Sequence, residues 1–319
     1  MKILIVGKNQ IMKWPQSVYR ALTALSYETE LFLFNKKNFS YCAMRLLGKK
    51  KRRAFLAKKL EQKINSFQPD LIFFVSAFFI PIELFNVLKK YPHITKIGWS
   101  ADRFEADKAP EANCLDYLFC SDYGFLDIAK NFTCKSIYLP LCSDPIPSYD
   151  PNTEKTLPPL FAGVLNPTRT KYLSACTTRC VLYVKNCPKG QLTQHEVHHH
   201  TIPHSQMLDL ISKSICPINV GLSVNNITGL NFRVFEVSAC GGLIMVNKEC
   251  ADISRCYEVG KEAVVYDTPE DLNKLVQDAV QNPKKYTAIA RAGYERTIKE
   301  HTYAKRMEQI LKIISDAKK

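Results

Sequence analysis

The residues best suited to chemistry in this sequence lie between Gly229 and Asn247 and read GLNFRVFEVSACGGLIMVN. The segment leaves a polar loop, continues as a short helix with Arg233 and Glu236, and emerges after two glycines as an apolar strand. A helix that opens after such a loop presents unpaired N–H groups and the positive end of its dipole, which suit a diphosphate. We therefore expect the backbone amides from Gly229 to Phe232, including that of Asn231, to bind phosphate oxygens.

Two side chains of this expected helix could assist. Glu236 lies one turn in and could accept hydrogen bonds from vicinal ribose hydroxyls, as an acidic residue does in dinucleotide-binding folds. The alternative is a carboxylate that only stabilises the first turns of its helix. Arg233 shares a helix face with Glu236 and could bind phosphate through two N–H groups. Its alternatives are an exposed side chain or an internal ion pair with Glu236.

The same segment resembles the spore-maturation-protein (CgeB-like) glycosyltransferase family. That family's pattern is Arg-x-Phe-Glu, small residues, a glycine pair and a strand, and the residues from Arg233 to Gly242 fill it. The stretch AGYERTIKEHTY, from Ala292 to Tyr303, resembles the family's tail. The resemblance covers roughly half the chain, from about Leu160 onward, and implies a glycosyltransferase that uses a nucleotide-sugar donor.

The resemblance also implies donor contacts before this segment. Gly163 ends an expected strand and is followed by LNPTRTK, where related enzymes place basic residues against the donor diphosphate; Arg169 and Lys171 are the candidates. Fixed cations and helix N-termini would stabilise charge on the leaving diphosphate. One position departs from many retaining enzymes of this fold, because Thr228 stands where they carry a second glutamate. A hydroxyl cannot supply that charge, so the stereochemical outcome stays open.

Two further segments resemble parts of related enzymes. In GWSADRFEAD, Asp102 follows a strand and an aromatic residue, and in an inverting reaction it would be the general base for the acceptor hydroxyl. A helix N-cap is an equally natural role for this aspartate. The stretch HTIPHSQM resembles a loop that holds the nucleotide base, where His200 and His204 either line the pocket or are ordinary surface groups.

The alternation of short apolar segments with helical stretches predicts an α/β fold with parallel sheets. Prolines between Leu141 and Pro159 interrupt the alternation and indicate a linker. We predict two doubly wound, Rossmann-like domains facing across a cleft (GT-B), at residues 1–143 on the acceptor side and 156–300 for the nucleotide sugar. Residues 301–319 would form a helix that crosses back to the first domain.

Two local predictions concern the second domain. We expect a helix from Ser205 to Ser214 with Ser205 as its N-cap, followed by the strand ICPINVG. In the first domain, the run from Arg45 to Lys59 contains eight basic residues. The apolar residues that follow at helical spacing should pack inward; they are Leu56, Leu60, Ile64 and Phe67.

Charge and cysteine content suggest partners and compartment. The net charge of +14 favours an anionic membrane surface, to which the protein would bind peripherally. We do not expect nucleic acid as a partner, because no recognised binding module is present. Twelve cysteines without a visible export signal indicate reduced thiols in the cytoplasm. Cys176, Cys180 and Cys187 form no CxxC pair, so we expect no metal.

The sequence therefore predicts a metal-independent glycosyltransferase with no cofactor beyond its nucleotide-sugar donor. Its acceptor would be a saccharide, a lipid-linked glycan or another envelope-type glycan. A non-catalytic nucleotide-sugar or glycan-binding relative, a basic nucleic-acid-binding protein and a sugar-nucleotide epimerase are the alternatives.

Overall fold

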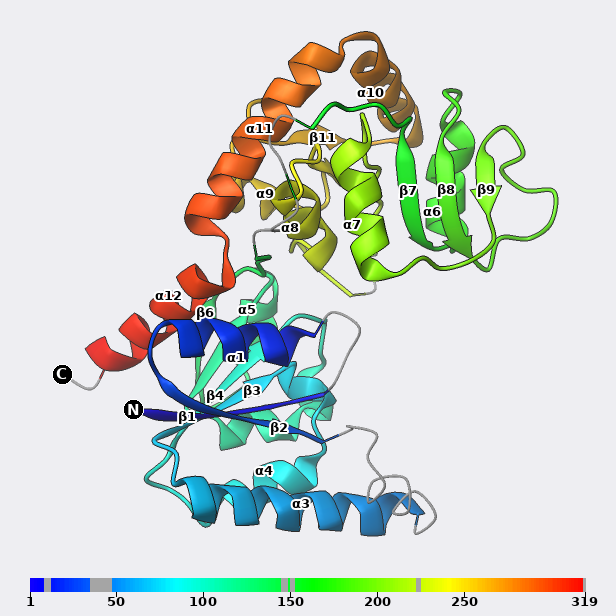
Figure 1. The fold of residues 1–319 in the computed structure, drawn as a ribbon. Coiled ribbons are helices and arrows are strands. Elements are labelled where there is room, and N and C mark those ends of the chain that lie inside the picture. Colours follow the sequence, from blue (N-terminus) through cyan, green and yellow to red (C-terminus); the bar gives the residue numbers. More distant parts are fainter. Residues whose placement is uncertain (9–12, 35–47, 145–148, 150–152, 222–224, 318–319) are drawn as a thin grey trace. The chain divides into compact units, whose positions relative to one another are not determined.

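The computed structural model describes residues 1–8, 13–34, 48–144, 149, 153–221 and 225–317 (Figure 1). The chain divides into two compact units. The first unit combines Met1–Pro140 with Tyr303–Lys319, and the second unit is Leu141–Thr302. The second unit is thus inserted into the sequence of the first.

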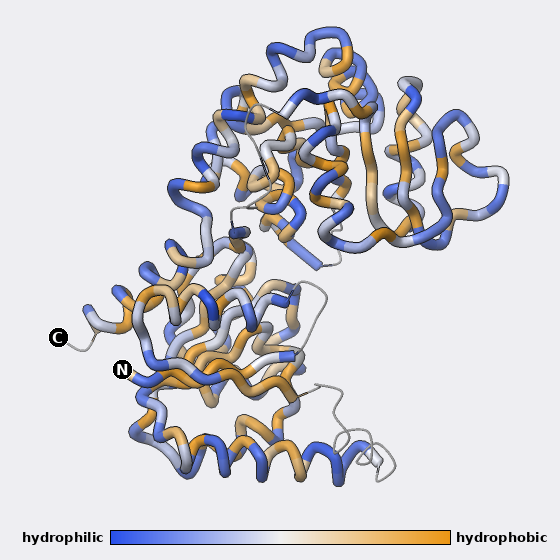
Figure 2. The backbone as a smooth tube through the Cα atoms, viewed as in Figure 1, coloured by the Kyte–Doolittle hydropathy of each residue, from blue (hydrophilic) through white to orange (hydrophobic). Residues whose placement is uncertain are grey.

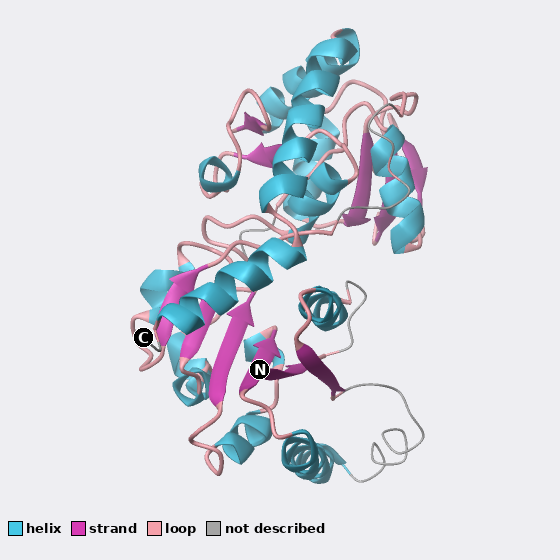
Figure 3. Cartoon of the chain, turned by 60° about the vertical axis from the view of Figure 1, so that its left-hand side comes forward, coloured by secondary structure: helices cyan, strands magenta, loops and turns pink. Residues whose placement is uncertain are grey.

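The first unit is built on a parallel sheet of six strands in the order β2-β1-β3-β4-β5-β6. Its central strands are apolar runs buried on both faces, as expected for a parallel sheet covered by helices. Figure 3 shows these strands between helices. The strands are β1 (Lys2–Gly7), β2 (Glu28–Leu33), β3 (Leu71–Val75), β4 (Thr95–Ser100), β5 (Tyr117–Cys120) and β6 (Lys135–Tyr138).

Helices cover both faces of this sheet (Figure 1). The helices are α1 (Trp14–Ala24), α3 (Gly48–Phe67), α4 (Ile82–Leu88), α5 (Phe125–Ala129) and α12 (Tyr303–Asp316). On one face α12 packs against α1, and on the other α3 packs against α4. Arg306 of α12 is buried, and its Nε donates to the Pro140 carbonyl at 2.8 Å.

The predicted inward stripe of α3 is confirmed. Leu56, Leu60, Ile64 and Phe67 are its buried residues and join the core beneath the sheet. Five lysines of α3 are exposed, and the start of the helix is hydrophilic (Figure 2).

The second unit contains two smaller parallel sheets. One has the order β7-β8-β9 and the other pairs β10 with β11. Its strands are β7 (Leu160–Val164), β8 (Val181–Lys185), β9 (Glu196–His198), β10 (Met245–Asn247) and β11 (Val264–Tyr266). Its helices are α6 (Pro167–Ala175), α7 (His204–Lys213), α8 (Phe232–Ala239), α9 (Ile253–Cys256), α10 (Pro269–Gln281) and α11 (Pro283–Glu300).

The predicted strand ICPINVG is wrong as a regular strand. The segment is mostly buried and exchanges hydrogen bonds with Leu160, but its residues form a single isolated bridge, between Leu160 and Pro217. The bonds to Leu160 are made by Cys216 and Ile218, so the N–H that Pro217 lacks would have pointed to the other side, where a further strand would pair. Ile218 nevertheless joins a core shared by both small sheets, packing with Leu182 and Met245.

The predicted N-cap of α7 is also wrong. The helix begins at His204, and the residue before it is Pro203, whose extended backbone (φ −55°, ψ 145°) caps it without a side-chain hydrogen bond. Ser205 is therefore already inside the helix.

The predicted fold class is confirmed: each unit is a Rossmann-like α/β arrangement of parallel strands with helices. None of the described helices combines the length and apolar composition needed to cross a bilayer.

Candidate functional site

The centre of the candidate site is the start of α8. Asn231 is the N-cap, and its side chain accepts a hydrogen bond from the Val234 amide at 3.3 Å. The helix thus begins where the sequence predicted, directly after the loop that contains Gly229. The positive end of the helix dipole lies at this loop, which favours an anion there.

Glu236 is a buried acid, with 5% of its surface exposed. One oxygen, Oε1, lies 2.7 Å from Nε2 of His204, and the other, Oε2, lies 3.3 Å from Nη1 of Arg233. Oε2 is buried and makes no hydrogen bond to the described residues. Burying a carboxylate oxygen without a hydrogen bond costs free energy, so this atom can gain from an added donor.

The internal ion pair that was one alternative for Arg233 is present, since its guanidinium reaches Glu236. A carboxylate leaves a forked guanidinium with spare N–H donors. Pairing with Glu236 is therefore compatible with contact to a second anion. His204 was one of two histidines considered for a base pocket, and the structure places it beside this acid.

Arg169 is fixed on α6 beside the same region. The side chain of Asn166 caps α6 by accepting from the Arg169 amide at 2.8 Å. The Arg169 guanidinium donates to the carbonyls of Val220 at 3.1 Å and Val164 at 2.7 Å. Burial lowers the pKa of Arg169, and the neighbouring charge of Arg233 lowers it further. The structure thus brings two predicted cations close enough to repel each other.

The other two predicted residues near α6 differ in placement. A side chain at Gly163 would meet the Arg169 guanidinium at 3.4 Å, so this glycine borders the arginine. Lys171 is exposed and lies two positions after Arg169. Residues with this spacing do not share a helix face, so Lys171 is not part of the arginine pair.

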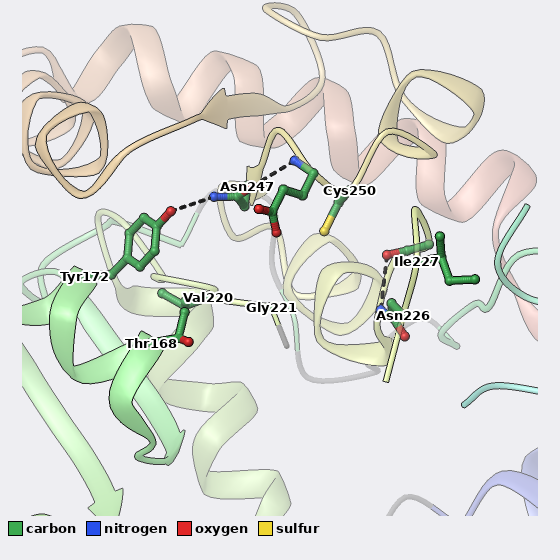
Figure 4. Close-up of a pocket in the computed structure, with 10 residues that line it drawn as sticks. Thr168, Tyr172, Val220, Gly221, Asn226, Ile227, Asn247 and Cys250 are labelled. Atoms are coloured by element: carbon green, nitrogen blue, oxygen red, sulfur yellow. Dashed lines mark hydrogen bonds between the residues drawn. The ribbon is translucent and has the colours of Figure 1, made fainter. Parts of the chain in front are cut away.

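A pocket of about 210 Å³ opens next to Arg169, which bonds to the carbonyl of the lining residue Val220 (Figure 4). Thr168 and Tyr172 of α6 line one side, and Asn226, Ile227 and Cys250 line the other. Gly229, Asn247 and Glu249 also contribute to its wall. The pocket lies at the carboxyl end of β10, where open α/β sheets bind ligands.

Sequence reasoning missed Tyr172, Asn247 and Glu249. Asn247 donates through Nδ2 to Tyr172 Oη at 2.9 Å and to the Asp267 carbonyl at 3.2 Å. One signal could have found this wall, because Asn247 is the polar residue that ends the apolar strand LIMV. The rule that ligands bind beyond strand carboxyl ends points to this position.

Thr228, where this chain departs from the second glutamate, is engaged internally. Its hydroxyl donates to Oδ1 of Asp252 at 3.1 Å, and Asp252 is buried and paired with Arg255 at 3.5 Å. The Thr228 hydroxyl therefore has a buried carboxylate as its partner within the protein.

In the first unit, Asp102 lies in the loop after β4, as predicted. Ser100 Oγ donates to the Asp102 carbonyl at 3.1 Å, and burial raises the pKa of the Asp102 carboxyl. The alternative role as a helix N-cap is wrong, since the next helical turn begins at Ala106 after Glu105. Asp102 is thus a partly buried acid at the carboxyl end of a central strand.

Of the three cysteines weighed for a metal site, Cys176 and Cys180 are buried, and His195 lies beside Cys180. His195 is buried, with Nδ1 3.3 Å from the Cys180 amide and Nε2 2.9 Å from the Leu173 carbonyl. Within the described ranges, no three His, Cys, Asp or Glu side chains converge as a metal site.

Comparison with solved structures defines the class of fold. Sucrose-phosphate synthase from Thermosynechococcus elongatus is similar over 99% of this chain and 100% of its own, with 9% identity and a TM-score of 0.64. The lipopolysaccharide outer core galactosyltransferase WaaB matches over 98% and 99%, with 14% identity and a TM-score of 0.62. Anabaena HepE in complex with UDP and glucose matches over 99% and 100%, with 13% identity and a TM-score of 0.59. The chain has the two-domain GT-B fold of these proteins.

Residues 175–312 match a protein family described as glycosyl transferase-like. The matched segment includes α8, α9, α10, α11 and most of α12. None of the curated proteins compared with the chain matches it significantly.

Proposed function

We propose that this protein is a glycosyltransferase that moves a sugar from a nucleoside diphosphate donor to a saccharide, a lipid-linked glycan or another envelope-type glycan. The observation that carries the proposal is the cluster of Glu236, Arg233 and Arg169. Glu236 and Arg233 lie on α8, inside the segment that matches the glycosyl transferase-like family, and Arg169 adjoins the pocket through its bond to Val220. The match with HepE, which holds UDP and glucose in its structure, supports a nucleotide sugar as the donor.

In this proposal each part of the cluster meets one part of the donor. Oε2 of Glu236, buried without a hydrogen bond to described residues, accepts from a ribose hydroxyl. Arg233, Arg169 and the amides at the start of α8 bind the diphosphate. An anion between the two guanidinium groups removes their mutual repulsion. The same groups stabilise the charge that develops on the leaving diphosphate, without a metal.

The acceptor is assigned to the first unit. Asp102 would take the proton of the acceptor hydroxyl in an inverting reaction. Its raised pKa favours this role, because a general base is most effective when its pKa approaches the working pH. We also propose that the protein is CgeB-like, on the basis of the residues from Arg233 to Gly242 and the tail from Ala292 to Tyr303.

Transfer is tested by incubating the protein with UDP-, GDP-, ADP- and CMP-linked sugars and measuring released nucleotide, with and without pooled envelope glycans. The proposal predicts that one nucleotide family binds and that acceptor increases release. Binding without release, with or without acceptor, would favour the non-catalytic relative. A donor converted to another sugar nucleotide without acceptor would favour the epimerase.

We further propose that the outer face of α3 contacts an anionic membrane. Its exposed lysines have no ion-pair partner among the described residues; they are Lys49, Lys50, Lys51, Lys58 and Lys59. Near a negatively charged leaflet each contributes about 1 kcal/mol. Replacing all five by Gln should lower sedimentation with phosphatidylglycerol vesicles more than tenfold, whereas five exposed lysines replaced in the second unit should have less effect. Equal binding to phosphatidylcholine vesicles, or tighter binding to duplex DNA, would contradict the proposal.

A further inference from the structure

The pocket next to Arg169 contains polar groups that make none of the proposed ribose and diphosphate contacts. Tyr172, Asn247 and Glu249 all line it. Its volume of about 210 Å³ is below the roughly 300–1,000 Å³ of pockets for drug-sized ligands. A pocket of this size suits a small group, such as one monosaccharide ring.

One wall of the pocket is held rigidly by Asn247. This residue is buried, and its Nδ2 donates hydrogen bonds to Tyr172 Oη and to the Asp267 carbonyl. Its Oδ1 accepts from the backbone N–H of Glu249 at 2.8 Å (Figure 4). Tyr172 Oη donates to the Asp267 carbonyl at 3.0 Å. Asn247 therefore fixes the backbone of Glu249 at the pocket wall.

The Glu249 carboxylate has no hydrogen-bond or ion-pair partner among the residues that the structure describes. An ionised carboxylate only accepts hydrogen bonds, so it attracts hydroxyl groups and repels other carboxylates. Burial raises the pKa of Tyr172, and the hydrogen bond from Asn247 opposes this rise. The negative charges of Glu249, Asp267 and Glu270 raise the pKa of Tyr172 further. This end of the pocket is therefore negative.

The other end of the pocket has the opposite character. Thr168 lies in the first turn of α6, one residue before Arg169, and Gly229 lies just before the start of α8. Both helix starts favour an anion. The pocket thus fits a ligand with an anionic end near the starts of α6 and α8 and an uncharged, hydroxyl-rich end near Glu249.

We propose that Glu249 binds hydroxyls of the donor sugar and selects neutral hexoses over hexuronic acids. This inference rests on the proposed glycosyltransferase function. Glu249 would thus supply a carboxylate to the sugar in a chain whose position 228 carries a threonine and not a glutamate.

The test uses isothermal titration calorimetry on the full chain. For whichever of UDP, GDP or ADP binds, affinities are compared for the free nucleotide, its hexose conjugate and its hexuronic acid conjugate. The wild type should prefer the hexose conjugate at least tenfold over the hexuronic acid. Glu249→Gln should reduce that preference to threefold or less, mainly through tighter binding of the hexuronic acid, with free-nucleotide affinity unchanged.

Glu270→Gln is the matched control, because Glu270 also acts on Tyr172 electrostatically but does not line the pocket. It should keep the wild-type preference. Nucleotide binding with an unchanged preference in Glu249→Gln, or no preference in the wild type, would overturn this inference alone. Failure of all three nucleotides to bind would overturn the proposed function, and this inference with it.

Discussion

Replacing Glu236 by Ala removes the acid that we assign to the donor ribose. Oε1 is already engaged by His204 at 2.7 Å, whereas the buried Oε2 makes no hydrogen bond to the described residues, so we assign the ribose hydroxyl to Oε2. One hydrogen bond to a charged group contributes about 1.5–3 kcal/mol. At about 1.4 kcal/mol per tenfold change, the dissociation constant of the nucleotide should rise about 10- to 140-fold.

The assay is calorimetry with the nucleoside diphosphate that binds the wild type, together with its 2′-deoxy and 3′-deoxy forms. In the wild type, removing the hydroxyl that contacts Oε2 should cost affinity. In Glu236→Ala the same removal should cost little, because its partner is gone. Glu236→Gln, which keeps the shape and one carbonyl acceptor, should lose less affinity than Glu236→Ala.

Glu295→Ala serves as the control, since this exposed glutamate of α11 pairs only with the exposed Arg291 in the described structure. Its nucleotide affinity should equal that of the wild type. A Glu236→Ala protein that is folded and binds nucleotide within twofold of the wild type would refute the ribose assignment. So would an equal deoxy effect in the wild type and the variant.

Three further predictions test other parts of the molecule. Arg169→Gln should weaken nucleoside diphosphate binding about 10- to 140-fold and affect the monophosphate less, because one charged phosphate contact is lost; equal losses for both nucleotides would contradict this. Asp102→Asn should lower the transfer rate about 10²- to 10⁴-fold with donor affinity unchanged. Because burial raises the pKa of Asp102, the wild-type rate should fall with decreasing pH above the ordinary carboxyl range, and this fall should be absent from Asp102→Asn. At Gly241 φ is +64°, a left-handed conformation that costs an alanine about 1–2 kcal/mol, and the added carbon would also overlap Tyr149. Gly241→Ala should therefore lower the free energy of unfolding in urea by more than this conformational cost. Gly260→Ala, at φ +88° in open space, should show the conformational cost alone; equal losses for the two variants would exclude the clash.

Much of the fold could be predicted because its signals are local. The apolar run at Leu71–Val75 and the stripe of α3 are each visible within one segment, and burial follows from them. The start of α8 was predictable for the same reason, since a polar loop before an amphipathic helix indicates an N-terminus. Pro217 is also a local signal against a regular strand, because proline lacks an N–H, but the apolar residues around it favour a strand.

The assembled site was less predictable, because it depends on contacts between distant segments. His204 and Glu236 meet across 32 positions of sequence, and Tyr172 and Asn247 meet across 75. No spacing rule within one helix or strand relates such pairs. Each residue could be picked out in the sequence by its type. Which of them meet depends on how the chain places α6, α7, α8 and β10 in space.

The insertion of the second unit between β6 and α12 affects how the protein is made. A ribosome releases residues 141–302 before it reaches α12, so the inserted unit can fold while its host still lacks a helix. Until then, the side of α1 that packs against α12 in the folded protein is uncovered. The nascent protein therefore passes through a stage in which the first unit is incomplete and exposes apolar surface. Chaperones that bind apolar surface would act on it at that stage.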